Sequence, residues 1–269
     1  MWTLSTDRLA LADSEGGTRQ TQPVGFEDWL AAAGDLLLGA SCHGCGQPWW
    51  GICPRCRQEL ASRRPFLTSP VPCPDGFPVT VTSSDYDRIL RRVINAHKER
   101  QALLLTRFLG ERLALSVYVL LASKAYPVDA SRIVLVPIPS SARTVRRRGF
   151  DATASMARLA ARRLSLRYRM TVRQALTQAR PIADQAGLSA QERQQNLAGA
   201  FRVRGSIRAG PVVLVDDLVT TGSSLTEAAR VLTKAGIPVL GAATVAATVR
   251  LRTPDPARIA PSGGPLFSD

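Results

Sequence analysis

The sequence lacks a long apolar segment. A transmembrane helix needs about 20 consecutive apolar residues, and the apolar stretch at 237–249 is too short for that and is typical of a buried strand. The first residues also lack the basic start and long apolar core of a signal peptide. We therefore expect a cytoplasmic protein without a membrane span.

Acidic residues are scarce as well. The 269 residues hold 21 Asp and Glu against 35 Lys and Arg, which gives a formal net charge of +14. This excess predicts anionic partners such as phosphates, nucleic acid or membrane lipid, although arginines scattered over solvated helix faces are the alternative. A hydrophobic share of 45% is enough for a core, so we expect one large domain or a main domain with a small appendage.

Cysteine is also rare, yet four of the five cysteines stand in one short stretch, CHGCGQPWWGICPRC. Its two Cys-x-x-Cys pairs can each form a tight knuckle, and the segment between them is long enough for a hairpin that joins the knuckles. Four sulfurs suit tetrahedral Zn²⁺ in a structural site with no open position, whereas two disulfides are the alternative in an oxidising compartment. The predicted zinc ligands are Cys42, Cys45, Cys53 and Cys56, and Cys73 stands alone.

Two adjacent aromatic residues, Trp49 and Trp50, lie in the middle of this predicted hairpin. They either pack onto a neighbouring helix or stack against the exposed bases of single-stranded DNA. Packing is the more economical interpretation for at least one of them. Both residues stay candidates for DNA contact.

The stretch VVLVDDLVTTGSSL, residues 212–225, combines a strand, two acids, a turn and a helix start. Its four leading apolar residues predict a strand buried on both faces, as in a parallel sheet covered by helices. We expect the two acids at the end of that strand and a helix that ends before Gly236. The first amides of such a helix lack intrahelical acceptors and carry partial positive charge, so they suit a phosphate. The predicted phosphate-binding residues are Thr220, Thr221, Gly222, Ser223 and Ser224.

The acid pair itself, Asp216 and Asp217, would repel the same phosphate and must face something else. Carboxylates accept hydrogen bonds from sugar hydroxyls and attract Mg²⁺. A ligand with a phosphate at one end and a vicinal diol in the middle fits both features, and ribose 5-phosphate is such a ligand. A plain strand end followed by a helix cap is the alternative.

Two further stretches carry candidate anion-binding groups. A second buried strand, residues 133–136, ends at two prolines and leads into Ser140, Ser141 and Arg143, at the edge where open parallel sheets bind ligands. The three arginines at 146–148 either face solvent or bind pyrophosphate. Residues 175–201 are polar and largely unpatterned, which indicates either a long functional loop or a disordered excursion.

Taken together, the cysteine knuckles, the helix over 86–98, VPIPSS followed by RRRGFD, DQAGLSAQERQQNLAGAF and LVDDLVTTGSSL resemble the ComF family. The last stretch is similar to the 5-phosphoribosyl 1-pyrophosphate (PRPP) motif of type I phosphoribosyltransferases. The resemblance implies an α/β protein, with a type I phosphoribosyltransferase fold of parallel sheet and flanking helices and a small N-terminal, four-cysteine, zinc-ribbon-like module. It also implies partners among DNA-uptake or recombination proteins.

The resemblance implies roles for particular residues. The acid pair would bind the ribose hydroxyls with Mg²⁺ nearby, and Lys98, which ends a helix, is a candidate phosphate contact. The pyrophosphate loop would comprise Ser140, Ser141, Arg143 and Arg148, and the flexible loop would contain Gln185, Arg193 and Asn196. This chain departs from the family in having only Cys73 where many relatives have a further cysteine pair, and Asp151 where an asparagine is usual.

These features predict a flexible tail at 1–24, a helix and zinc module at 25–64, a proline-containing linker around 65–78, a phosphoribosyltransferase-like domain at 79–250 and a flexible tail at 251–269. Three functions fit them. The protein is a phosphoribosyltransferase with a nitrogen acceptor, a single-stranded DNA handling protein of natural transformation, or a PRPP-responsive regulator without turnover. Purine-type relatives carry a third carboxylate, suited to act as general base, where this chain has Thr220.

Overall fold

The computed structural model describes residues 41–99, 102–123, 132–180, 196–205 and 210–248, together with the backbone of 251–252. The predicted N-terminal tail, the helix expected before Ser41, and the flexible-loop residues Gln185 and Arg193 lie outside the described residues. The predicted C-terminal tail lies outside them from residue 253 onward.

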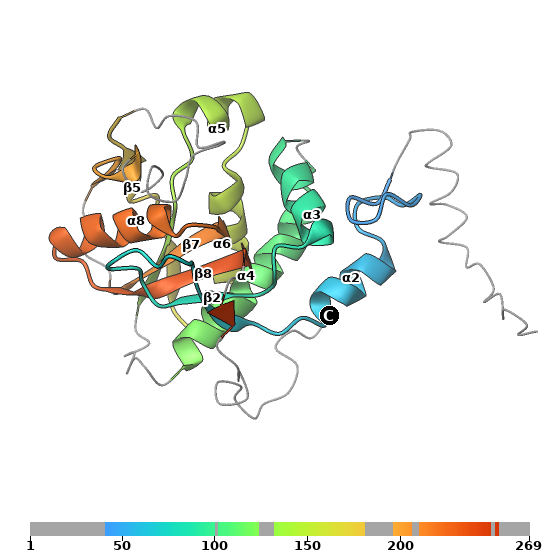
Figure 1. Cartoon of the computed structure of the whole chain (residues 1–269), viewed down its shortest axis with the longest axis horizontal. Helices are drawn as coiled ribbons and strands as arrows, with labels where there is room; N and C mark the ends of the chain where they lie inside the picture. The colour runs from blue at the N-terminus through green and yellow to red at the C-terminus, as the bar shows by residue number, and fades with distance from the viewer. Residues whose placement is uncertain are drawn as a thin grey trace, which may run out of the picture.

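A mostly parallel sheet forms the centre of the molecule (Figure 1), with strand order β4-β3-β7-β8-β2-β1-β9. The parallel strands are β4 (Met170–Val172), β3 (Ile133–Pro137), β7 (Val212–Val219), β8 (Val239–Ala247) and β2 (Thr80–Thr82). At one side β1 (Phe66–Ser69) pairs antiparallel with β2 and with β9 (Leu251–Arg252). The α/β class expected from the sequence is confirmed, but part of the predicted linker is strand β1.

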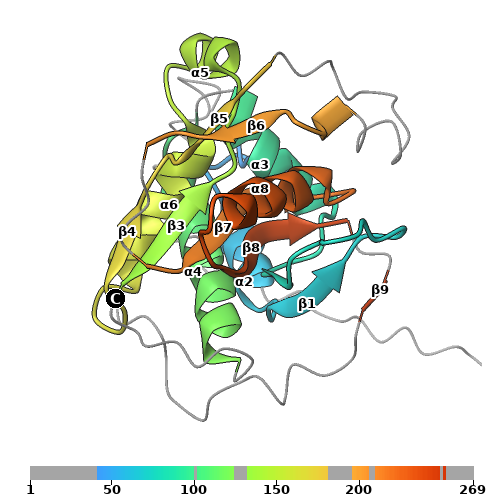
Figure 2. The same cartoon turned by 90° about the vertical axis from the view of Figure 1, so that its left-hand side faces the viewer.

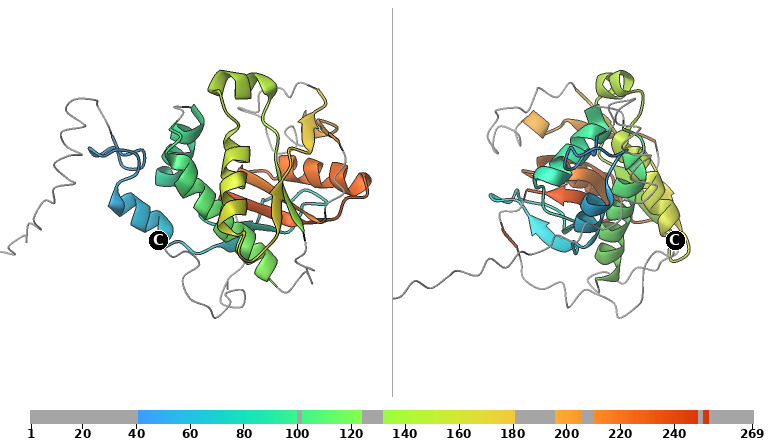
Figure 3. Two further views of the ribbon diagram at one scale, coloured as in Figure 1. Left: turned by 180° about the vertical axis from the view of Figure 1, so that it is seen from behind. Right: turned by 90° about the vertical axis from the view of Figure 1, so that its right-hand side faces the viewer.

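Helices cover both faces of this sheet (Figure 2). One face carries α4 (Leu105–Ala122) and α6 (Ala152–Arg163), with α3 (Arg88–Glu99) beside α4, and the other carries α8 (Ser223–Lys234). The view from behind shows α4 and α6 side by side (Figure 3). Gly110 permits this approach, because a Cβ atom there would collide with the side chain of Leu159.

The strands alternate between two apolar clusters, as the two-residue period of a strand requires. In β7, Val213 and Val215 belong to the cluster under α3, α4 and α6, whereas Val212 and Leu214 belong to the cluster under α8. All four are fully buried. The strand is therefore covered on both faces, as its unbroken apolar run predicted.

The N-terminal module packs against α3 (Figure 1). It consists of a hairpin closed by a bridge between Ser41 and Pro48, followed by α2 (Pro54–Ala61). Ile52 and Leu60 join the same apolar cluster as α3 and α4. The module thus shares its core with the larger domain.

A buried arginine fastens the chain between the module and the sheet. Arg112 of α4 donates from Nη2 to the carbonyl oxygens of Ser83 at 2.6 Å and Arg63 at 2.8 Å, and from Nη1 to that of Ala61 at 3.3 Å. Burial lowers the pKa of Arg112 to about 10, which still leaves it charged at neutral pH. Charge-assisted bonds to carbonyls therefore hold the linker in place.

The polar segment at 175–201 is not irregular at its ends. There β5 (Leu176–Gln178) and β6 (Phe201–Val203) pair as an antiparallel ribbon. Arg180 donates to the carbonyl oxygens of Asn196 at 2.8 Å and Ala198 at 3.0 Å, which closes the ribbon further. The short strands escaped the sequence analysis because three residues are too few to establish a period.

Replacement of Arg112 by Met should lower the free energy of unfolding by about 3 kcal/mol, because the buried carbonyls lose their donors. Urea denaturation followed by circular dichroism measures the change. Arg107→Met on the same helix is the control, since its exposed pair with Glu111 contributes at most about 0.5 kcal/mol. Equal effects of the two substitutions would contradict a fastening role for Arg112.

Candidate functional site

The acid pair lies inside strand β7, which continues to Val219. The prediction that Asp216 and Asp217 stand at the strand end was wrong by two residues. The ladder to β8 continues past them, with Leu218 opposite Ala246. Both carboxylates therefore sit on regular extended backbone near the carboxyl edge of the sheet.

Strand geometry turns the two carboxylates to opposite faces. Asp217 is buried, with 3% of its surface exposed, and its Oδ2 forms an ion pair with Nζ of Lys98 from α3. Asp216 is half-buried, and its Oδ1 accepts a hydrogen bond from the backbone N–H of Asp217 at 2.8 Å. The two carboxylates nevertheless remain close enough for each to shift the pKa of the other.

The two acids differ in pKa because their surroundings differ. Burial, followed by the neighbouring charge of Asp217, raises the pKa of Asp216 well above its ordinary value. Burial also acts to raise the pKa of Asp217, but the Lys98 ammonium outweighs it and lowers that pKa below its ordinary value. Asp217 is therefore the carboxylate that stays ionised, with Lys98 as its counter-ion.

The end of α3 that supplies Lys98 is held on both sides. His97, with 1% of its surface exposed, hydrogen-bonds Thr106 at 2.8 Å and meets the ring of Phe150 edge-on at 5.3 Å between centroids. Burial lowers the pKa of His97 to about 4, so it is neutral at neutral pH. Glu99 pairs with Arg147, at 2.9 Å, and with Arg148 of α5 (Ala142–Arg148).

This pairing bears on the predicted role of Arg148. The Arg148 side chain is mostly buried and forms an ion pair with Glu99, which ties α5 to α3. The sequence missed Glu99 and His97 as neighbours of the site, because their partners come from a segment far along the chain.

The turn after β7 leads directly into α8. Gly222 precedes the helix with φ of +74°, and no side-chain oxygen caps the first amides of α8. The hydroxyls of Thr221 and Ser223 lie 3.0 Å apart, and Thr220 is exposed. The predicted phosphate cradle, Thr220 to Ser224, is thus a turn with uncapped amides and four hydroxyl groups, including that of Ser224.

Gly222 is required for a reason that the sequence did not reveal. A Cβ atom there would lie 2.6 Å from the ring of Phe77 and 3.0 Å from Pro70. The segment between β1 and β2 therefore packs directly against the turn. Positive φ and this contact together favour glycine.

The loop after β3 lies beside the acid pair, because Pro137 pairs with Val215 and the N–H of Ile138 donates to Val215 O at 2.9 Å. Ser140, Ser141 and Arg143 follow at once, as predicted. Ser141 caps α5 by accepting from the N–H of Thr144 at 3.0 Å. The structure therefore brings the predicted pyrophosphate loop and the acid pair to one edge of the sheet.

The segment that leads into β6 is anchored on α8. Asn196 lies at the stem of the ribbon, and Glu227 accepts from the N–H of Gly199 at 2.9 Å while it binds Arg230. Glu227 is 5% exposed, which makes it an acid on the buried side of an amphipathic helix. An acid on the apolar face of the predicted helix was the one sequence signal that could have indicated a structural role for Glu227.

Asp151, the departure from the usual asparagine, acts as a helix cap. Its Oδ1 accepts from the N–H of Ala154 at 3.0 Å at the start of α6, and its Oδ2 accepts from Nε2 of Gln174 at 2.9 Å. Asp and Asn are both good N-cap residues, so the fold accepts either.

The four cysteines form one cluster, with all four sulfur atoms within 4.8 Å of one another. The N–H groups of Gly44 and Cys53 donate to Sγ of Cys42 at 3.4 and 3.3 Å. Burial opposes ionisation of Cys42, but backbone hydrogen bonds outweigh it and lower its pKa to about 7. This is a donor set suited to a tetrahedral metal ion such as zinc, with every ligand supplied by the protein.

The two tryptophans differ in environment. Trp49 packs against the apolar cluster of α3 and α4, whereas Trp50 is 57% exposed. Both line a cavity of about 390 Å³, and the Arg57 guanidinium lies beside it, 5.7 Å from the centroid of the Phe108 ring. One tryptophan therefore has a packing role, and the other offers an open aromatic surface.

Among the helices that the structure describes, none combines the length and the apolar character that crossing a membrane requires.

Comparisons with known proteins agree with this geometry. A family model described as the phosphoribosyl transferase domain matches residues 129–258. DNA utilization protein YhgH of Salmonella typhi is 31% identical over 219 residues, which cover 75% of this chain and 94% of that protein, and the Escherichia coli (strain K12) protein of the same name is 30% identical with the same coverage. Competence protein F of Haemophilus influenzae is 48% identical over 56 residues, 20% of this chain and 24% of that protein. The chain belongs to the ComF family and combines a phosphoribosyltransferase domain with an N-terminal cluster of four cysteines.

Proposed function

We propose that the protein binds PRPP and transfers its ribose 5-phosphate to a nitrogen acceptor with release of pyrophosphate. The observation that carries this proposal is the meeting, at one edge of the sheet, of the acid pair, the uncapped start of α8 and the loop after β3. These three elements offer acceptors for a diol and donors for two phosphate groups. Hydrogen-bond acceptors between two groups of hydrogen-bond donors suit PRPP better than a simple phosphate.

Each part of PRPP has a proposed partner. The 5-phosphate binds at the turn of Thr220 to Ser224, and the ribose hydroxyls donate to the acid pair. The pyrophosphate binds at Ser140, Ser141 and Arg143. Lys98 keeps Asp217 ionised and hence a strong acceptor. Its ammonium, which forms an ion pair with that carboxylate, is also a proposed contact for a phosphate of PRPP.

Mg²⁺ is the metal that this ligand would bring, since oxygen ligands of the half-buried Asp216 and of pyrophosphate suit it. When bound, it would supply charge neutralisation for the leaving pyrophosphate. The protein's own contribution is to hold the diol, exclude water at the apolar walls of the sheet edge and place cationic groups at the leaving group.

In the proposed transfer, the nitrogen lone pair forms a bond to C1 while the bond from C1 to the pyrophosphate oxygen breaks. The pyrophosphate leaves with that electron pair, and the nitrogen gives up a proton if it carries one. Thr220 stands where purine-type relatives have a carboxylate, so this chain offers no base at that position. We therefore propose an acceptor nitrogen that is neutral before it reacts. If no acceptor reacts, the alternative is a regulator that binds PRPP without turnover.

A second candidate function, the handling of single-stranded DNA, is favoured by the open ring of Trp50. Bases stack on exposed aromatic rings, and Arg57 beside Phe108 supplies a nearby cation. Relatives named for DNA utilization and for competence agree with such a role, as does the net charge of +14. Proteins of DNA uptake or recombination would then be partners.

We further propose that the cysteine cluster holds one structural Zn²⁺. Four thiol ligands leave no open position for catalysis. The cluster lies against α3, where Gly44 packs near Cys56 and Ile89. Zinc would thereby fix the surface that supports the Lys98 helix.

Substitution of both Asp216 and Asp217 by Asn should weaken PRPP binding in the presence of Mg²⁺ by about 30-fold, which corresponds to about 2 kcal/mol, because neutral amides lose charge-assisted acceptors. Isothermal titration calorimetry gives the affinity. Glu59→Gln removes a carboxylate elsewhere and should leave it unchanged. Unaltered affinity in the double variant would refute the site. If PRPP binds but no pyrophosphate is released when nucleobases or amines are supplied as acceptors, the regulator without turnover is favoured.

Protein purified without chelator should contain about one zinc per chain by elemental analysis, because the four clustered sulfurs complete a tetrahedral site. Cys42→Ser should lose the metal and lower the thermal stability of the module. Cys73→Ser is the matched control, since Cys73 is exposed and outside the cluster. A metal-free parent protein would rule out this assignment.

Trp50→Ala should weaken binding of a labelled single-stranded oligonucleotide by about 1 to 3 kcal/mol, the effect of one lost base stack. Fluorescence anisotropy over a salt series measures this, and affinity should also fall as salt rises. Leu166→Ala removes an exposed apolar side chain away from the tryptophan cavity and serves as control. If the parent protein binds no oligonucleotide at low salt, the second function is wrong.

A further inference from the structure

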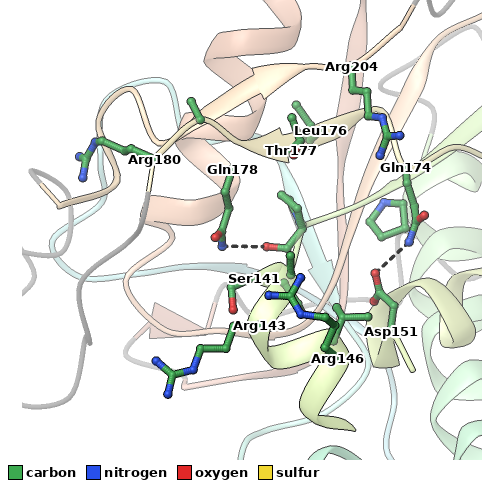
Figure 4. A pocket seen from close by; sticks show the side chains of 16 residues that line it. Ser141, Arg143, Arg146, Asp151, Gln174, Leu176, Thr177, Gln178, Arg180 and Arg204 are labelled. Carbon is green, nitrogen blue, oxygen red and sulfur yellow. Dashed lines mark hydrogen bonds between the residues drawn. The ribbon is translucent and has the colours of Figure 1, made fainter. Parts of the chain in front are cut away.

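A large cavity lies between α5, the loop after β3 and the β5–β6 ribbon (Figure 4). Its volume is about 830 Å³, within the range of about 300 to 1,000 Å³ typical of small-molecule sites. Neither acid of β7 and no residue of the turn before α8 lines it. The cavity is therefore beside the proposed PRPP site and shares only the loop after β3 with it.

Arginine dominates the charge of this cavity. Its lining contains Arg143, Arg146, Arg180 and Arg204 and one carboxylate, Asp151. That carboxylate already accepts from Gln174 (Figure 4) and from the N–H of Ala154 at the start of α6.

Among the described residues, the arginines that line the cavity lack the carboxylate partner that neighbouring arginines have. Arg147 and Arg148 on the same helix pair with Glu99, whereas Arg143, Arg146 and Arg204 form no ion pair within the part of the chain that the structure describes. Arg180 donates to carbonyl oxygens of the ribbon stem, which leaves its charge uncompensated. The cavity consequently attracts an anion.

The apolar part of the cavity wall favours a ligand larger than a bare inorganic anion. Pro137, Val145 and Leu176 line the cavity together with the arginines, and these apolar surfaces gain nothing from a phosphate group. The hydroxyl of Thr177 and the amide of Gln178 stand on the ribbon side. Apolar walls, scattered amide and hydroxyl groups and several arginines together suit a flat heterocycle joined to a phosphate.

We propose that this cavity is a second ligand site, which binds a nucleotide, either free or as one unit of a single strand. The arginines bind the phosphate, and the base lies against the apolar walls. This site does not depend on PRPP binding at the acid pair. It also differs from the tryptophan cavity, which is on the cysteine module.

The test uses the full-length zinc-loaded protein and calorimetry with adenosine 5′-monophosphate. We expect the double variant Arg146→Gln/Arg204→Gln to bind it at least about tenfold more weakly, because two charge-assisted contacts are lost. PRPP affinity should stay unchanged in that variant. The exposed Arg162→Gln, at the far end of α6, is the control for loss of positive charge and should bind both ligands normally.

The acid-pair variant provides the reverse comparison. Asp216→Asn/Asp217→Asn should lose PRPP binding and keep nucleotide binding, so failure of either site is recognised separately. Nucleotide binding that disappears in the acid-pair variant would place the nucleotide in the PRPP site and overturn the proposal. If the double variant does not fold, the single variant Arg204→Gln replaces it, since Arg204 lines the cavity outside the loop after β3. Nucleotide affinity that is unchanged in Arg204→Gln would overturn the proposal.

Binding of inorganic pyrophosphate and of an oligonucleotide distinguishes a nucleotide site from a simple anion site and a free nucleotide from a strand. Inorganic pyrophosphate that binds as tightly as the nucleotide, with the same loss in the arginine variant, would show a simple anion subsite and overturn the proposal. An oligonucleotide that displaces the nucleotide, and itself depends on Arg146 and Arg204, identifies a strand as the source. A nucleotide that binds while the oligonucleotide fails to displace it identifies the free molecule.

Discussion

The ion pair between Lys98 and Asp217 is the interaction on which the edge of the sheet depends. A carboxylate buried in a parallel sheet is costly to keep charged, and without a counter-ion it would take up a proton. The ammonium from the end of α3 removes that cost and holds Asp217 ionised. For Asp216, one residue earlier, burial and the charge of Asp217 outweigh the effect of Lys98, so its pKa is raised well above the ordinary value. One helix end thus decides which of two identical side chains ionises more readily.

Three parts of the molecule meet on that helix. The cysteine module contacts α3 through Gly44, whose carbonyl accepts from Arg92 at 3.4 Å. The sheet contacts it through Asp217, and α5 contacts it through Glu99. The module and α3 share one apolar cluster and pack against each other there. The position of the acid pair's counter-ion is therefore supported by the cysteine module.

Arginines perform different tasks in different places, although composition treats them alike. Arg112 is buried and donates to carbonyls, Arg147 and Arg148 pair with a carboxylate, and Arg143 and Arg146 line a cavity. A net charge of +14 therefore overstates the part that is free to attract an anion. What the charge means for function follows from which guanidinium groups lack a carboxylate partner.

The sequence by itself determined the features that depend on neighbouring residues. The strand, turn and helix around the acid pair, the buried strand at 133–136 and the cysteine knuckles were all predictable, because period and spacing act over a few residues. Tertiary structure alone decided that Lys98 faces Asp217, that Phe77 packs on Gly222, that Glu227 anchors the ribbon stem and that part of the linker becomes β1. Each of these joins segments far apart in the chain, and such pairings follow from how the elements pack rather than from any local pattern.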